Sequence, residues 1–102
     1  MNIEDILRQA QLMQSKMAEM QEGLAGKSVE GSSGGGMVRA VVTGKLELVS
    51  VSIDTAVVDP EEVDMLQDLV TAAVNDALRQ AKQLAEREMA GLAGGFKIPG
   101  LM

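Results

Sequence analysis

The side chains of this sequence that could carry chemistry are carboxylates, lysines, arginines and hydroxyls. The 102 residues include no cysteine and no histidine. Cysteine nucleophiles, disulfides and thiolate metal sites are therefore excluded, and the commonest general base and metal ligand are missing. One phenylalanine is the only aromatic residue, so the chain offers no platform on which unstacked bases could lie. Composition therefore argues against most enzyme classes and against a metal site built on histidine or cysteine.

Acidic and basic residues are distributed unevenly along the chain, which has a net charge of −6. No base lies between Lys45 and Arg79, whereas eight acids do: Glu47, Asp54, Asp59, Glu61, Glu62, Asp64, Asp68 and Asp76. The acid-rich stretch could in principle bind a divalent cation, but its spacing does not match a calcium loop. Acids at a helix start complement the helix dipole, and we favour this structural explanation.

Three bases follow this stretch: Arg79, Lys82 and Arg87. They would oppose the negative end of a predicted helix, which is a sufficient structural reason for them. They could also contact phosphates if a dimer brought two such sets together.

A glycine-lysine-serine run, Gly26-Lys27-Ser28, resembles the end of a phosphate-binding loop. That motif needs a glycine five positions before Gly26, where this sequence has Gln21. It also needs a preceding strand, but the run follows a predicted helix. We therefore reject a nucleotide-binding loop.

Apolar spacing predicts two long helices. Residues 2–23 repeat apolar side chains at alternating steps of three and four, with Asn2 as the N-cap. This stripe consists of Ile3, Ile6, Ala10, Met13, Met17, Met20 and Leu24. The second helix covers about residues 60–90, with Asp59 as its cap and Pro60 in its first position. Its apolar stripe is broad and runs nearly from end to end.

The segment between the helices, about residues 27–54, predicts an antiparallel meander of three strands. Residues 37–43 are β-branched and apolar, which is typical of a strand. Residues 49–54 alternate apolar and polar side chains, which predicts one dry face. Gly44-Lys45 is expected to form a two-residue turn with glycine first.

Together these elements indicate one α+β domain over residues 1–102, in the order helix–strand–strand–strand–helix, with an irregular apolar tail at residues 91–102. A helix over residues 60–90 would be about 46 Å long, whereas a compact chain of this size is about 34 Å across. Three short strands cannot cover both apolar stripes. We therefore expect a two-fold homodimer that removes the stripes from water.

The sequence resembles the bacterial nucleoid-associated YbaB/EbfC family over nearly its whole length. The resemblance rests on the order and spacing of QAQLMQ (residues 9–14), EGSSGGGMV (30–38), SID (52–54), LQDLVTAAVNDA (66–77) and GGFKIPGL (94–101). It implies a tweezer-like homodimer that binds double-stranded DNA with little sequence preference and has neither enzymatic activity nor a cofactor. Family DNA contacts are attributed to the terminal helices. By that resemblance the candidates here are Arg8, Lys16, Arg79, Lys82 and Arg87.

Our leading expectation is a cytoplasmic, nucleoid-associated homodimer that contacts DNA phosphates without reading bases and influences nucleoid organisation or gene expression. A second class stays open. The chain could be a protein-interaction adaptor, for example for the recombination or replication machinery, that uses its Met-rich helix or apolar tail and contacts DNA incidentally. The first five residues are acidic where a secretory signal is basic, and no apolar run approaches the ~18 residues of a membrane span. No membrane partner is expected.

Overall fold

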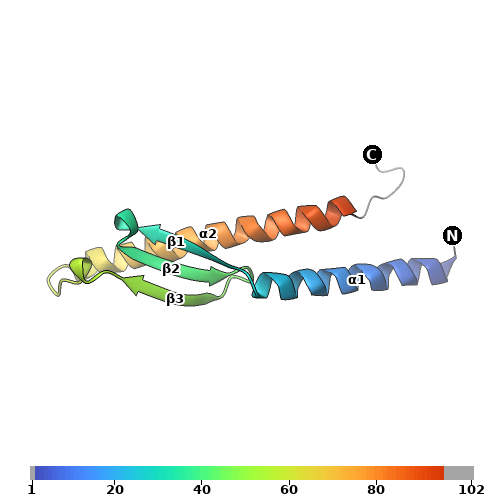
Figure 1. The fold of residues 1–102 in the computed structure, drawn as a ribbon, viewed down its shortest axis with the longest axis horizontal. Helices are drawn as coiled ribbons and strands as arrows, with labels where there is room; N and C mark the ends of the chain where they lie inside the picture. Colours follow the sequence, from blue (N-terminus) through green and yellow to red (C-terminus); the bar gives the residue numbers. More distant parts are fainter. Residues whose placement is uncertain (1, 96–102) are drawn as a thin grey trace.

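One antiparallel sheet and two long helices form the structure, a computed structural model that describes residues 2–95 (Figure 1). In chain order the elements are α1 (Ile3–Ala25), β1 (Ser28–Ser33), the 3-10 turn η1 (Gly34–Gly36), β2 (Val38–Thr43), β3 (Leu48–Ile53), the 3-10 turn η2 (Thr55–Val57) and α2 (Val63–Gly95). The strands pair antiparallel in the order β1-β2-β3. The predicted order of elements and the predicted meander are confirmed.

The molecule is long and thin. Its principal extents are 70 × 24 × 16 Å and its radius of gyration is 19.9 Å, whereas a compact chain of about 100 residues has a radius near 13 Å. Figure 1 shows the cause: α1 and the last part of α2 both extend beyond the sheet on the same side. The core lies only where α2 crosses the sheet.

Small side chains let α2 lie directly on the sheet. The buried face of α2 consists of three alanines spaced four residues apart, and β2 meets them with three small aliphatic side chains. These six residues are Ala73, Ala77, Ala81, Val38, Ala40 and Val42. β1 approaches the helix through Gly31, where a Cβ would lie 2.5 Å from the carbonyl oxygen of Ala73 and would also collide with Ala77. Glycine is required there because strand and helix are in contact.

β3 is left uncovered by α2. The helix contacts β1 and β2 extensively but β3 only slightly, and all six residues of β3 are exposed. Val51 pairs with Ala40 and Ile53 with Val38, so these side chains share the face on which α2 lies. The dry face predicted for this strand needs a cover, and residues 2–95 of a single chain do not supply it.

The β2–β3 connection differs from the predicted two-residue turn. Its positive φ, 65°, belongs to Leu46 rather than to Gly44. The Thr43 N–H donates to the Glu47 carbonyl at 2.8 Å, which closes a longer loop. Gly44 instead lies against the end of α1, where a Cβ would be 2.6 Å from the Leu24 carbonyl oxygen. The predicted turn is wrong because Gly44 serves close packing rather than turn geometry.

The helix ends also follow local hydrogen bonds. Asn2 Oδ1 accepts from the Asp5 N–H at 2.9 Å, which confirms the predicted cap of α1. α2 begins at Val63, not at residue 60. The Asp59 carbonyl accepts from the Glu62 N–H at 2.9 Å, and Asp59 Oδ1 accepts from the Glu61 N–H at 3.0 Å. These bonds form a separate turn before the helix, so the predicted start at Asp59 and Pro60 is wrong by a few residues.

The far end of α2 is longer than predicted. The helix continues to Gly95, so residues 91–95, which we expected in an irregular tail, are helical. The rest of the predicted tail, residues 96–102, lies outside the described residues.

Candidate nucleic-acid interface

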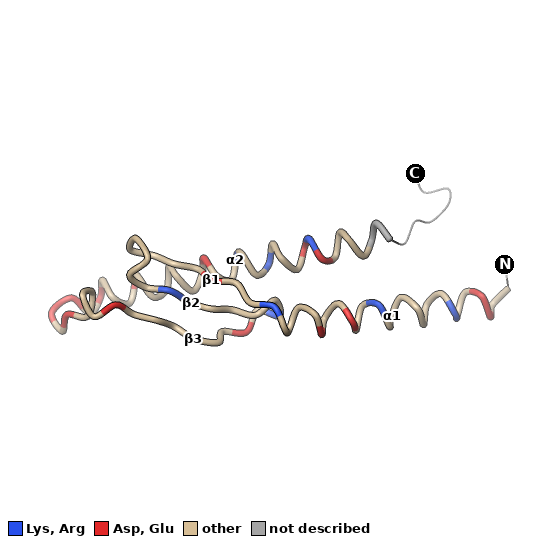
Figure 2. The backbone as a smooth tube through the Cα atoms, viewed as in Figure 1, with Lys and Arg blue, Asp and Glu red and all other residues tan. Residues whose placement is uncertain are grey.

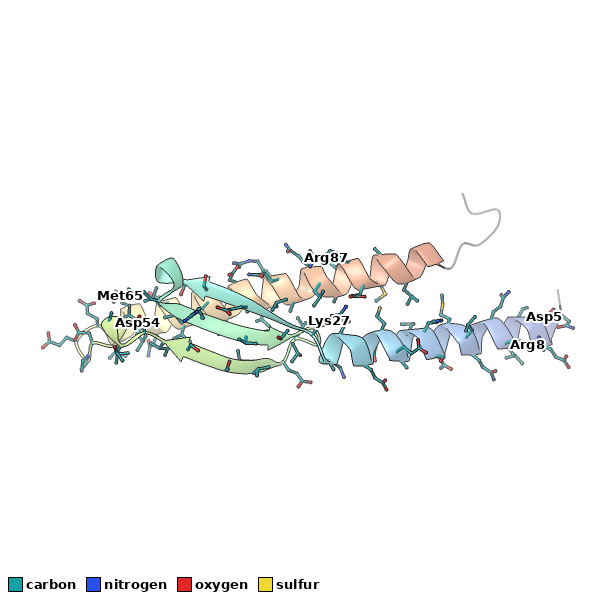
Figure 3. All side chains as sticks on the ribbon, in the orientation of Figure 1. Asp5, Arg8, Lys27, Asp54, Met65 and Arg87 are labelled. Atoms are coloured by element: carbon teal, nitrogen blue, oxygen red, sulfur yellow. The ribbon has the colours of Figure 1, made fainter. Side chains whose placement is uncertain are left out.

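The five predicted DNA-contacting residues lie on two arms, which we define as α1 and residues 79–95 of α2. Arg8 and Lys16 belong to α1, and Arg79, Lys82 and Arg87 belong to α2. All five are exposed. Figure 3 shows Arg8 and Arg87 on separate arms, far from the labelled Asp54 and Met65 at the other end of the molecule.

Two of the three bases on α2, Arg79 and Lys82, lie on the side of the helix that faces away from the sheet. At about 100° per residue, Lys82 and Arg87 each lie within about 80° of Arg79 around the helix axis, and Arg79 and Arg87 are about 12 Å apart along it. The buried alanines lie opposite Arg79 and Lys82, whereas Arg87 lies about 80° from the middle of the alanine row. A polyanion could therefore contact this basic face without disturbing the core.

α1 presents a weaker positive surface. It carries two bases among four acids. Lys16 Nζ lies 4.0 Å from Glu19 Oε2, so this base is partly neutralised by its own helix. Arg8 forms no ion pair with any residue in the described part of the chain, and it lies opposite the apolar stripe of α1.

One ion pair joins α2 to the segment that follows α1. Lys27, just after α1, pairs with Glu88 of α2, 61 residues further along the chain. This pair removes Glu88 from the acids that would oppose a polyanion on α2. It also ties the C-terminal end of α1 to the arm formed by α2.

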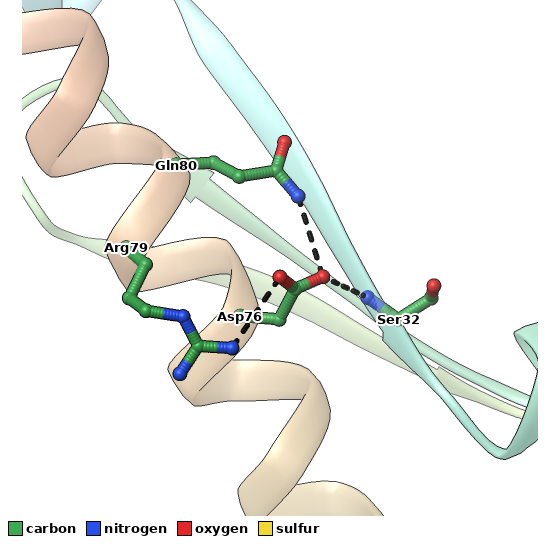
Figure 4. A network of polar contacts seen from close by, with 4 residues as sticks. All are labelled: Ser32, Asp76, Arg79 and Gln80. Carbon is green, nitrogen blue, oxygen red and sulfur yellow. Dashed lines mark hydrogen bonds and ion pairs between the residues drawn. The ribbon is translucent and has the colours of Figure 1, made fainter.

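A carboxylate of α2 joins Arg79 to the sheet (Figure 4). Asp76 Oδ2 accepts from the Ser32 N–H of β1 at 3.0 Å and from Gln80 Nε2 at 3.3 Å. Asp76 Oδ1 lies 3.5 Å from Arg79 Nη2. Sequence analysis did not single out Asp76, although its three-residue spacing from Arg79 on a helix is a readable signal.

Two shallow grooves follow the flank of α2, and the first of them also borders the β2–β3 connection. The first, of about 360 Å³, is lined by Leu46, Asn75, Leu78, Arg79 and Lys82. The second, of about 440 Å³, is lined by Lys82, Ala85, Glu86, Met89 and Ala90. The structure therefore brings Arg79 and Lys82 to one groove, and it leaves Arg87, Arg8 and Lys16 outside both. Leu46, which is 51% exposed, was not predicted to border this site.

Negative charge collects at the opposite end of the molecule, which we call the acidic end and define as residues 54–68. It contains six acids and no base, and Figure 2 shows acidic residues gathered at the end of the molecule away from the arms. This separation of charge orients the molecule in the field of a polyanion, with the arms toward it.

Metal binding and membrane spanning find no support in the described residues. Among residues 2–95, no group of acidic side chains could hold a metal ion. None of the helices in this part of the chain is both long enough and apolar enough to cross a bilayer.

Comparison with known proteins gives a consistent result. A family model described as the YbaB/EbfC DNA-binding family matches residues 1–96. A nucleoid-associated protein of Syntrophobacter fumaroxidans is 56% identical over 95 residues, which cover 93% of this chain and 86% of the relative. Another from Caldanaerobacter subterraneus subsp. tengcongensis is 55% identical over 100 residues, covering 98% and 90%. The crystal structure of an uncharacterised protein from Helicobacter pylori has the same fold, with a TM-score of 0.82, 22% identity, and coverage of 92% of this chain and 99% of that chain.

Proposed function

The chain belongs to the YbaB/EbfC DNA-binding family, whose members are not enzymes, and from this premise we propose that it is a nucleoid-associated homodimer that binds double-stranded DNA through phosphate contacts. Binding would show little sequence specificity and would influence nucleoid organisation or gene expression. The sequence resemblance to this family is thereby confirmed. The DNA-contacting residues would be Arg8, Lys16, Arg79, Lys82 and Arg87.

The observation that carries this proposal is the basic outward face of α2. Arg79 and Lys82 lie there together, Arg87 follows further along the same arm, and Glu88 is already paired with Lys27. In the described part of the chain, α1 and α2 carry no aromatic side chain that could stack on a base. Lysine and arginine contacts to phosphate depend on charge rather than on base identity, so this surface favours binding without sequence readout.

The homodimer is supported by two apolar surfaces that a single chain leaves in water. One is β3, whose apolar side chains share the face covered by α2 but are contacted by that helix only slightly. The other is the stripe of α1, where Met13 and Met17 are more than a third exposed and Ile3 and Ile6 are more exposed still. A second copy is the simplest partner, because two-fold dimers are the commonest assembly of identical chains.

The test is a titration of a labelled duplex of random sequence at several salt concentrations, from about 50 to 200 mM. We expect the logarithm of the affinity to fall linearly with the logarithm of the salt concentration, with a shallower slope for the double variant Arg79→Ala with Lys82→Ala. Duplexes of unrelated sequence should bind alike. No binding at about 50 mM salt would refute the proposal.

The oligomeric state is tested separately by light scattering after size exclusion at micromolar concentration. A dimer has twice the 10.7 kDa mass of the chain. A particle of the single-chain mass would overturn the dimer while leaving the DNA titration open.

A second candidate function is favoured by the exposed apolar stripe of α1. In an adaptor, this stripe would bind a different protein, for example one of the recombination or replication machinery, and DNA contact would be incidental. The two candidates predict different effects of substitution. An adaptor should stop binding its protein partner when Met13 and Met17 become glutamate, and it should still bind that partner when Arg79 and Lys82 become alanine.

A further inference from the structure

We propose that Asp76 is a positioning residue that lowers the affinity of α2 for phosphate by holding Arg79. This inference rests on the proposed function, because it names a residue that regulates the same surface. Asp76 lies among the residues that fasten the helix to the sheet, yet one of its two oxygens faces a base of the proposed interface (Figure 4).

The two carboxylate oxygens of Asp76 have different partners. Oδ2 accepts both hydrogen bonds that come from the fold, from the Ser32 N–H at 3.0 Å and from Gln80 Nε2 at 3.3 Å. Oδ1 has Arg79 Nη2 at 3.5 Å. The fold therefore needs only one oxygen, and the other is available to Arg79.

The carboxylate is held more firmly than the guanidinium. The side chain of Asp76 is 32% exposed and receives a bond from a strand backbone, whereas that of Arg79 is 69% exposed. A fixed negative charge thus stands beside a movable positive one. A DNA phosphate that approaches Arg79 must compete with this carboxylate, and it also feels the repulsion of the carboxylate's charge.

Asparagine at position 76 separates the two roles. Its Oδ1 can still accept from the Ser32 N–H, while its NH₂ group would face Arg79 and could not attract it. Asp76→Asn should therefore keep β1 on α2 and release Arg79. Asp68→Asn is the matched control, because Asp68 is an exposed acid of the same helix that has no ion pair within the described residues.

The experiment measures duplex affinity and its salt dependence for the full chain with each substitution, with and without Arg79→Ala. We expect Asp76→Asn to raise the affinity about two- to fivefold per chain, which is the range for releasing an exposed ion pair. The slope against salt should steepen by up to about 0.9, the value of one additional phosphate contact. Asp68→Asn should have a smaller effect, and the gain from Asp76→Asn should disappear when Arg79 is already alanine.

An equal gain from Asp68→Asn, or a gain that persists without Arg79, would overturn the proposal, because either result reflects only a change in net charge. If circular dichroism shows that Asp76→Asn does not fold, carbon NMR of the wild-type chain tests whether Arg79 leaves Asp76 on DNA binding. The carboxyl signal of Asp76 should shift when saturating duplex draws Arg79 away, and an unchanged signal would overturn the proposal. Failure of the wild type to bind DNA at all would instead count against the proposed function.

Discussion

Residues 63–81 of α2 lie on the sheet, whereas residues 82–95 extend beyond it. The same apolar stripe runs through both halves, but Ala77 in the first half is fully buried and Leu84, on the same face in the second half, is only partly buried. The first half begins in the acidic end, and the second carries Lys82 and Arg87. The comparison teaches that the sheet, not the helix pattern, decides which apolar residues stabilise the chain and which stay available to a partner.

The largest effect is expected when α2 is forced away from the sheet. Gly31→Val would place a side chain against Ala73 and Ala77, where even a Cβ has no room. We expect a loss of about 3 kcal/mol in the free energy of unfolding, measured by urea titration. The matched control is Gly23→Ala on α1, where nothing lies within 4 Å of an added Cβ. That change should stabilise the helix slightly, by about 0.5–1 kcal/mol. Equal stability of the Gly31 variant and the wild type would contradict the close approach of β1 to α2.

A second test concerns the arm that the sheet does not cover. Met13→Glu combined with Met17→Glu puts two charges into the apolar stripe of α1. If the stripe faces a second copy, the dimer dissociation constant should rise by more than about a hundredfold, because burying an unpaired charge costs several kcal/mol. Analytical ultracentrifugation over a dilution series measures this.

The matched control for the stripe is Gln11→Glu with Ser15→Glu, on the polar side of the same helix. These residues add the same charge where no partner is expected, so the dimer should persist. If both double variants dissociate equally, the effect comes from net charge and the stripe does not form the interface.

The third test sharpens the difference between the two arms. Arg79→Ala with Lys82→Ala should weaken duplex binding about tenfold or more at ~100 mM salt, because each lost phosphate contact removes the free energy gained from releasing counterions. Arg8→Ala with Lys16→Ala should have a smaller effect, because Lys16 is already paired with Glu19. Fluorescence anisotropy on one duplex compares the two variants. An equal loss would mean that α1 contributes as much as α2.

The smallest expected effect is at the free end of α1. Asn2→Ala removes the acceptor of the Asp5 N–H, which should cost about 1 kcal/mol of helix stability. Because this end lies far from the core, the midpoint of global unfolding should hardly move, while amide exchange in the first turns of α1 accelerates. A matching fall in global stability would show that α1 unfolds together with the sheet.

Sequence patterns predicted the elements well because their periodicities are local. The heptad of α1 and the alternation in β3 both require only neighbouring residues. Whether an apolar face is covered is not local: β3 alternates as a half-buried strand does, yet α2 lies over β1 and β2 instead. The predictions failed at turns for a related reason. Gly44 was predicted to be a turn residue, but a glycine is needed there because Leu24 leaves no room for a side chain.

The candidate site was predictable in residue type but not in pairing. The clustering of bases after Arg79 is visible in the sequence, whereas the link between Lys27 and Glu88 joins residues 61 apart and needs the fold. The split roles of the Asp76 oxygens depend on where β1 crosses α2, which no spacing reveals.

The alanines through which α2 packs on the sheet also limit the heat capacity change when a single chain unfolds. Methyl groups remove little apolar area from water, and much of the larger apolar surface stays hydrated on β3 and α1. Heat capacity on unfolding tracks that area, and a chain of this length ordinarily shows about 1.2–1.5 kcal/mol/K. A solitary copy should fall clearly below this range, and an associated pair should approach it per chain. Scanning calorimetry over a range of protein concentrations therefore reports how many copies melt as one unit.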